Sequence, residues 1–191
     1  GIVASASGAS DEVWSQLVDM CFLAISFSTE VGGFGAGAIS LIGVMQALGE
    51  FLVLEPVLPT LLAGRLIDRC ADTATRIDLL EPVVSGKSRH AFAHTEDATR
   101  YRRDIANTTA TRNGTGWTLN GLKLFVIGAP LADCLVVSAT TPAGGLSLFI
   151  VPAATPGITL TEFRNFDDQR AADVRFDNVH LPSTALIGLE A

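Results

Sequence analysis

The second half of the chain, from Arg89 onward, alternates apolar and polar residues with a period of two and is divided by short turns. Two Asn-Gly dipeptides, beginning at Asn113 and Asn120, favour type I′ hairpin turns and bracket a short run around Trp117. Further runs of strand character cover residues 122–127, 134–139, 146–151, 157–163 and 172–179. Because no helical segment separates these runs, they predict an antiparallel sheet or small barrel and argue against a Rossmann unit.

The first half has helical spacing instead. Ser10 or Asp11 can cap a helix that runs to about Phe22, and a second helix is expected within residues 38–54. A third is expected over residues 60–76, with an Asp72–Arg76 pair on its polar side. Its inward positions are predicted to be Leu62, Leu66, Cys70, Ala74 and Ile77. Pro82 and Gly86 are expected to end the helical part, which predicts an α+β chain with a helical domain over residues 1–86 and a β-domain over residues 87–191.

The segment from Ala38 to Leu54 is the longest apolar run and is the candidate for a membrane span. Ser40, Gln46 and Glu50 interrupt it, so it falls short of the roughly 20 apolar residues that a span requires. We therefore predict no membrane span and interpret the run as a helix buried on most sides. The mean hydropathy of +0.39 is high, and it predicts that a partner chain or further polypeptide covers part of this surface, in a homo- or hetero-oligomer.

The three cysteines, Cys21, Cys70 and Cys134, are odd in number and scattered. This pattern predicts reduced thiols in a cytoplasmic protein and argues against a disulfide scaffold or a zinc site. The N-terminus has neither a basic segment nor a clean apolar segment of a signal peptide, so export is not expected.

The net charge of −7 conceals a basic island within residues 87–123. Its seven basic residues outnumber three acidic ones; they are Lys87, Arg89, Arg100, Arg102, Arg103, Arg112 and Lys123. One basic island in an acidic chain suits a small phosphate-bearing ligand and not a nucleic acid, which usually needs a broader basic face. The alternative is a solvated charge cluster on a loop.

Two short motifs are candidates for binding a ligand. The glycine-rich residues 32–37 resemble a dinucleotide fingerprint, but no strand precedes them, so a tight helix–helix turn is the better interpretation. The sequence His94-Thr95-Glu96 follows the first predicted strand, where a hydroxyl and backbone N–H groups could face a ligand and nearby arginines could reach phosphates. The alternative for this motif is an ordinary polar strand end.

The order of several motifs resembles the N-terminal helical domain and central β-domain of the acyl-CoA dehydrogenase family. The residues that carry the resemblance are 30–35 (EVGGFG), 92–96 (FAHTE), 116–123 (GWTLNGLK), 132–133 (AD), 168–170 (DQR) and 176–182 (FDNVHLP). The run at 116–123 is the most specific, and the resemblance extends over nearly the whole chain. The C-terminal four-helix bundle of the family has no counterpart in these residues.

The resemblance implies FAD as cofactor and an acyl-CoA thioester as substrate, dehydrogenated between Cα and Cβ. It implies that Phe92, His94 and Thr95 lie along the isoalloxazine ring, with Thr95 bonded to the pyrimidine edge. Phe125 matches the aromatic residue that packs on the flavin. Ile127 stands where the family usually has a threonine beside flavin N5. No catalytic base and no metal ligand is predicted in this chain.

Three hypotheses follow from these residues. The first is a flavin-dependent acyl-CoA dehydrogenase present without its last domain, favoured by Thr95, Phe125 and the basic island. The second is a non-catalytic or FAD-poor subunit that pairs with a competent dehydrogenase subunit. It is favoured by Ile127, which cannot donate a hydrogen bond, and by the bulky residues 97–104 in place of a small glycine-rich phosphate turn. The third is a flavin monooxygenase or oxidase on the same scaffold, since fold does not fix chemistry.

Overall fold

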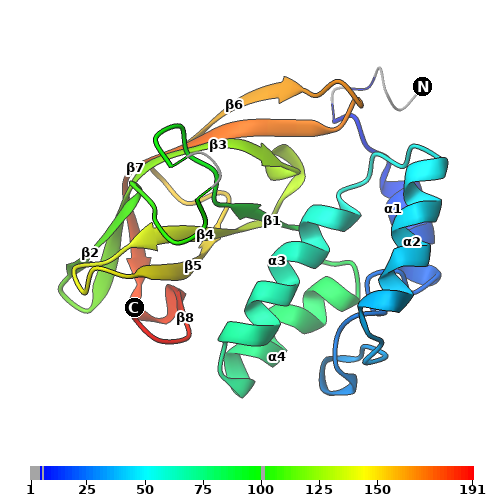
Figure 1. The fold of residues 1–191 in the computed structure, drawn as a ribbon, viewed down its shortest axis with the longest axis horizontal. Helices are drawn as coiled ribbons and strands as arrows, with labels where there is room; N and C mark the ends of the chain where they lie inside the picture. The colour runs from blue at the N-terminus through cyan, green and yellow to red at the C-terminus, as the bar shows by residue number, and fades with distance from the viewer. Residues whose placement is uncertain (1–4, 6, 100–101) are drawn as a thin grey trace.

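The computed structural model describes residues 5, 7–99 and 102–191. Its helices gather at one end of the molecule and its strands at the other (Figure 1). The α-helices in the described part are α1 (Asp11–Asp19), α2 (Ala38–Glu50), α3 (Val57–Cys70) and α4 (Thr73–Val84), and a short 3-10 helix, η2, spans Thr29–Val31. No helix among the described residues is both long and apolar enough to cross a membrane.

The start of α1 agrees with the sequence prediction. The Ser10 hydroxyl accepts a hydrogen bond from the Val13 amide at 3.3 Å, which satisfies one of the free N–H groups of the first turn. The helix turns Trp14 and Leu17 into the protein interior.

The single helix expected over residues 60–76 is wrong, because two helices occupy this region. Asp72 has an extended backbone and its carboxylate accepts the Thr75 amide at 3.0 Å, so it caps a new helix instead of continuing the old one. The predicted inward face is also wrong for Leu62, which is 51% exposed, and for Cys70 and Ala74, which are exposed. Arg76 pairs with Glu30 at 2.6 Å and not with Asp72. Pro82 lies inside α4 and does not end it.

Helix α2 forms as predicted but is not buried. None of its residues is buried within this chain, and Ile39 and Ile42 are 84% and 64% exposed. Phe51 and Leu52, just after the helix, are each 76% exposed. The expectation of a helix buried on most sides is therefore wrong for this chain alone.

Within the described residues, eight strands form one mostly antiparallel sheet. They are β1 (His90–Ala93), β2 (Thr109–Asn113), β3 (Gly116–Ile127), β4 (Cys134–Thr140), β5 (Leu146–Pro152), β6 (Ile158–Arg164), β7 (Arg170–Pro182) and β8 (Leu186–Ile187). The order is β6-β7-β3-β2-β4-β5-β8, and β1 pairs with β4. The β1–β4 and β2–β4 pairs are parallel, whereas the other pairs are antiparallel. The α+β architecture expected from the sequence is confirmed.

Only one of the two Asn-Gly dipeptides makes a hairpin. Asn113 pairs with Gly116, so Gly114 and Thr115 form a two-residue loop between β2 and β3, as predicted. Asn120 and Gly121 lie inside β3 instead, at a shift in the pairing with β7. The Asn120 side chain accepts the Asn178 amide of β7 at 2.8 Å, so the dipeptide continues the strand through a bulge.

Two apolar cores hold the molecule together. One lies within the sheet and contains Trp117 and Phe149, whose rings meet edge to face with centroids 5.2 Å apart. The other joins the helices to the sheet, since Phe27 and Ile67 share it with Val136 of β4. Helix α3 is thereby held against β1, which positions its first turns beside the candidate site.

Candidate functional site

A pocket of about 220 Å³ lies between the first turns of α3 and the sheet. We call it the α3–sheet pocket. Helix α3 contributes Leu58, Pro59 and Leu62, and the sheet side is formed by Phe92, Thr95, Phe125 and Ile127. The structure therefore brings four of the five predicted site residues into one pocket, although they lie up to 35 positions apart in the sequence.

Phe125 owes its position to an irregularity in β3. The pairing between β3 and β7 shifts between Lys123 and Val126, and Phe125 adopts a φ of +54°, in the left-handed region. Its amide donates to the Asp173 carboxylate at 3.0 Å, and its ring lies on Phe163 with centroids 5.7 Å apart. A non-glycine residue in this conformation is strained, and such strain is concentrated at functional sites. The bulge leaves the aromatic side chain half exposed at the pocket.

Thr95 and His94 directly follow β1, but only the Thr95 side chain lines the α3–sheet pocket. The Thr95 side chain is exposed at the pocket, while its carbonyl accepts the Leu124 amide of β3 at 2.8 Å. His94 does not line the pocket. Its ring stacks on Phe92, with centroids 5.4 Å apart and planes 13° from parallel, so it supports a pocket wall from behind.

Beneath this segment lies a buried charged pair that the sequence reasoning missed. Lys123 is fully buried, and its ammonium donates to Glu96 at 2.6 Å, to the Ser138 hydroxyl at 3.0 Å and to the His94 carbonyl at 3.3 Å. These three acceptors use all three protons of the ammonium. The Glu96 carboxylate also accepts the amides of Asn107 and Thr108. The network fixes the backbone on both sides of Thr95.

His94 extends the same network. Its Nε2 faces the Arg102 carbonyl at 3.3 Å, which can only accept, so Nε2 carries the proton. Nδ1 then accepts from the Ser138 hydroxyl at 2.9 Å. Burial, together with the positive charge of Lys123, lowers the pKa of His94, so the ring is neutral at pH 7. Both ring nitrogens are engaged, which suits a positioning role behind Phe92.

The pKa values of the buried pair move in the same direction for different reasons. Burial alone raises the pKa of Glu96, but the hydrogen bonds from Lys123, Thr108 and Asn107 outweigh it and leave the pKa lowered. Burial lowers the pKa of Lys123, and the Glu96 carboxylate opposes that shift. Glu96 is therefore ionised at neutral pH.

Among the described residues of the basic island, four side chains are each paired with a carboxylate of this chain. Arg89 pairs with Asp11, Arg102 with Asp104, Arg112 with Glu190, and Lys123 is the buried partner of Glu96. Arg100 lies outside the described residues. The interpretation of Lys123 as part of a solvent-facing island is wrong. No local signal could have shown this, because a lysine between the apolar residues 122 and 124 of a strand is the pattern of a solvent-facing side chain.

The pocket is lined by apolar and aromatic side chains plus one hydroxyl, and none of its seven lining residues carries a carboxylate. Within the part of the chain that the structure describes, no three His, Cys, Asp or Glu side chains gather as a metal site. The flat aromatic walls at Phe92 and Phe125, with Thr95 at one edge, fit a planar ring system that offers hydrogen-bond acceptors at its rim.

Comparison with known proteins agrees with this geometry. Residues 91–179, which contain most of the sheet, match the family described as "Acyl-CoA dehydrogenase, middle domain". Acyl-CoA dehydrogenase FadE12 of Mycobacterium tuberculosis is 32% identical over 189 residues, which cover 94% of this chain and 48% of FadE12. The chain belongs to the acyl-CoA dehydrogenase family.

Solved structures show the same fold. The "Tcur3481-Tcur3483 steroid ACAD G363A variant" superposes with a TM-score of 0.86 at 28% identity, over 98% of this chain and 50% of that one. The ChsE4-ChsE5 complex from Mycobacterium tuberculosis gives a TM-score of 0.88 at 22% identity, with the same coverage, and shows the fold alone. The chain spans about half the length of the relatives that it matches.

Proposed function

We propose that this chain supplies the flavin-binding β-domain surface of an FAD-dependent acyl-CoA dehydrogenase that acts on an acyl-CoA thioester. The α3–sheet pocket carries the proposal, because it joins Phe92, Thr95, Phe125 and Ile127 in one aromatic-walled recess. Membership of the acyl-CoA dehydrogenase family supports the cofactor and the substrate class. The site residues Phe92, His94, Thr95, Phe125 and Ile127 form part of this proposal.

Each side chain has a distinct role in this proposal. Phe92 and Phe125 would pack on the isoalloxazine ring, and the Thr95 hydroxyl would donate to its pyrimidine edge. His94 would hold Phe92 in place through the 5.4 Å stack. Ile127 would exclude water but, as an aliphatic side chain, could donate no hydrogen bond to the ring. Bound FAD would accept the hydride from the acyl Cβ.

Proton abstraction requires a base that this pocket lacks. The α-proton of an acyl-CoA needs a nearby carboxylate, and none of the residues lining the pocket is Asp or Glu. Because Ile127 offers the ring no hydrogen-bond donor, we expect the 191-residue chain to bind FAD weakly; because the pocket has no base, we expect it to show no acyl-CoA dehydrogenation on its own. The proposed division into a helical domain over residues 1–86 and a β-domain over residues 87–191 places the pocket where the two meet.

FAD titration of the purified chain tests the proposal. We expect weak but saturable quenching of flavin fluorescence, which Thr95→Val weakens about tenfold because a hydrogen bond to the ring is lost. Thr161→Val, which alters an exposed threonine on β6 away from the pocket, should bind FAD like the parent chain. Equal FAD affinity for parent and Thr95→Val, or turnover of an acyl-CoA by the chain alone, would refute the proposed roles.

A second candidate function is a non-catalytic, FAD-poor subunit that pairs with a competent dehydrogenase subunit. Ile127 favours it, since the position beside flavin N5 offers no donor. The exposed apolar residues Ile39, Ile42, Phe51 and Leu52 favour an oligomer in either case. Three unpaired cysteines support a cytoplasmic location. A complete absence of FAD binding at millimolar flavin, together with a stable complex with a flavin-containing subunit, would favour this second function.

A further inference from the structure

The ring of Phe125 faces the α3–sheet pocket because β3 is irregular at this point. In a regular strand Phe125 would share the face of Lys123, which is fully buried inside the sheet. Two residues of β3, Leu124 and Phe125, instead stand opposite Asp173 alone, which is the pattern of a β-bulge. The bulge turns the aromatic side chain outward and leaves it 52% exposed at the pocket.

Both backbone amides of the bulge are bonded to neighbouring segments. The Leu124 amide donates to the Thr95 carbonyl at 2.8 Å, and the Phe125 amide donates to the Asp173 carboxylate at 3.0 Å. A carboxylate is a stronger acceptor than a neutral carbonyl. Phe125 has a φ of +54°, a conformation that bulky side chains rarely adopt. The bond to Asp173 therefore offsets backbone strain at the residue that presents the ring.

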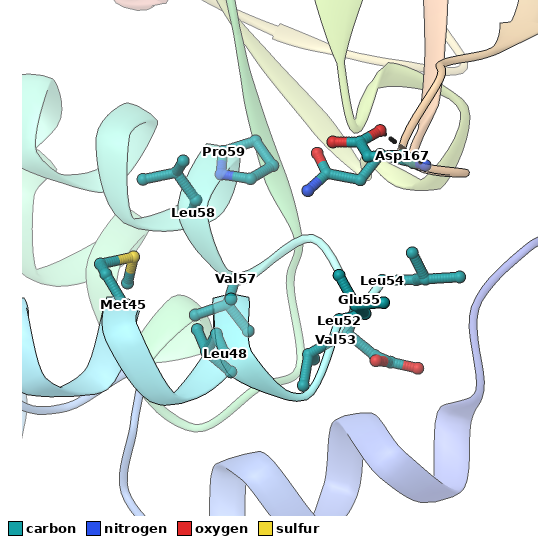
Figure 2. Close-up of a pocket in the computed structure, with 12 residues that line it drawn as sticks. Met45, Leu48, Leu52, Val53, Leu54, Glu55, Val57, Leu58, Pro59 and Asp167 are labelled. Atoms are coloured by element: carbon teal, nitrogen blue, oxygen red, sulfur yellow. Dashed lines mark hydrogen bonds between the residues drawn. The ribbon is translucent and has the colours of Figure 1, made fainter.

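The carboxylates of the β6–β7 hairpin differ in the groups that they bond. Asp167 borders a space of about 310 Å³ between α2 and the start of α3, and it accepts an amide of its own turn at 3.1 Å (Figure 2). Asp177 accepts the side-chain amide of the adjacent Asn178 at 2.9 Å. Asp173 reaches a different strand, and no cation among the described residues forms an ion pair with it. Its carboxylate is thus available to the amide of the bulge.

We infer that Asp173 is a positioning residue that acts on the flavin ring through Phe125. Its carboxylate holds Phe125 in the left-handed conformation that keeps the aromatic ring at the pocket, where it packs on Phe163 of β6. The inference rests on the proposed function and adds to it a residue that does not itself line the pocket. Without this acceptor an extended conformation is favoured, and it would carry the ring toward the sheet interior.

Three substitutions test this role against a matched control. Asp173→Val and Asp173→Ala remove the acceptor, and valine also suits a strand. Asp173→Asn keeps an oxygen acceptor without the charge and should restore the parent behaviour. Asp177→Val is the control, because it removes an exposed carboxylate from the same strand without touching the bulge.

NMR of the 15N-labelled chain reports the conformation of Phe125 in the absence of flavin. The amide and α protons of a left-handed residue lie closer together than those of an extended residue. The parent chain, Asp173→Asn and Asp177→Val should therefore show a strong intraresidue amide–α NOE at Phe125, which Asp173→Val and Asp173→Ala should lose. Loss of stability alone would not remove this signal from the folded chain.

FAD titration then measures the consequence for the pocket. We expect Asp173→Val to bind FAD about tenfold more weakly than the parent chain, and Asp173→Asn less than about threefold more weakly. Asp177→Val should bind FAD like the parent chain. Neither the NOE nor the titration depends on turnover.

The outcomes separate this inference from the proposed function. If Asp173→Val keeps both the NOE and the FAD affinity of the parent chain, the inference is overturned and the proposed function stands. The inference is also overturned if the NOE is lost but FAD affinity is unchanged, or if Asp173→Asn behaves like Asp173→Val. If the parent chain binds no FAD, the proposed function is overturned and the inference with it.

Failure to fold is decisive as well. If Asp173→Val and Asp173→Ala both fail to fold while Asp177→Val folds, Asp173 supports the whole β-domain instead of one ring. The assignment as a positioning residue is then overturned.

Discussion

Replacing Lys123 by methionine tests whether the buried ion pair holds the segment that carries Thr95. Methionine keeps the length and apolar body of the side chain but removes all three hydrogen-bond donors. The Glu96 carboxylate, 4% exposed, keeps two backbone amides and loses its 2.6 Å partner, while Ser138 and the His94 carbonyl each lose a donor. An uncompensated buried charge then remains.

The size of the effect follows from this geometry. Breaking a buried pair by removing one partner costs about 3–5 kcal/mol of unfolding free energy. For a chain of this size, that corresponds to a fall in Tm of roughly 6–20 °C. Thermal unfolding followed by circular dichroism measures it. Arg102→Met, which removes an exposed pair with Asp104, should leave Tm nearly unchanged.

The double variant Lys123→Met/Glu96→Gln separates a lost interaction from a stranded charge. The amides of Asn107 and Thr108 bond different oxygens of Glu96, so glutamine keeps an acceptor for only one of them. It carries no charge, however, and because the stranded buried charge is the larger cost, the double variant should be more stable than Lys123→Met alone. The reasoning would be refuted if the double variant lost as much unfolding free energy as Lys123→Met and Glu96→Gln lose together. It would also be refuted if Lys123→Met were as stable as Arg102→Met.

Three further predictions concern other parts of the chain. Burial lowers the pKa of His90 to about 4 against the opposing charge of Asp133. Since the folded pKa lies below the unfolded value of about 6.5, neutral His90 imposes no penalty above pH 6.5, and the free energy of unfolding should fall by about 3 kcal/mol as the pH drops toward 4. Denaturant unfolding at pH 7 and pH 4.5 measures this loss, which should be smaller in His90→Gln. Phe125→Asn should keep or raise Tm, because asparagine tolerates a positive φ, while FAD titration shows weaker binding. Ser10→Ala should cost about 1 kcal/mol in urea unfolding through loss of the α1 cap, and an unchanged midpoint would contradict the capping role.

The sequence predicted those features that depend on nearby residues. The Ser10 cap, the turn at Gly114 and the strand runs follow from local spacing, and each is present in the structure. Thr95 and Phe125 could be nominated because a family resemblance linked motifs that lie far apart. The pocket that joins them could not be predicted, because it depends on how α3 packs against β1, and no local sequence pattern indicates that packing.

The errors share a physical cause. Lys123 and Glu96 are 27 positions apart, and only the register of the sheet brings them to 2.6 Å. Asn120 has a strong turn signal, but the Asn178 amide on β7 offers its side chain a partner inside the strand. Asp72 has acceptable helical neighbours on both sides and still ends one helix and starts another, because its carboxylate bonds the Thr75 amide. In each case a tertiary or side-chain partner outweighs the local preference.

Helix α2 has thirteen residues, none of them buried, and it contacts the helical core through the partly buried Leu41, Met45 and Leu48. Isolated helices shorter than about 12–15 residues are marginal in water. Amide hydrogen exchange in α2 should therefore be much faster than in α3, which buries seven residues. A surface that covers Ile39 and Ile42 would also stabilise the helical conformation of α2. The free energy of binding to that surface would therefore include the cost of ordering the helix. The same coupling would tighten one wall of the space of about 310 Å³ between α2 and the start of α3, since Met45 and Leu48 of this helix line it.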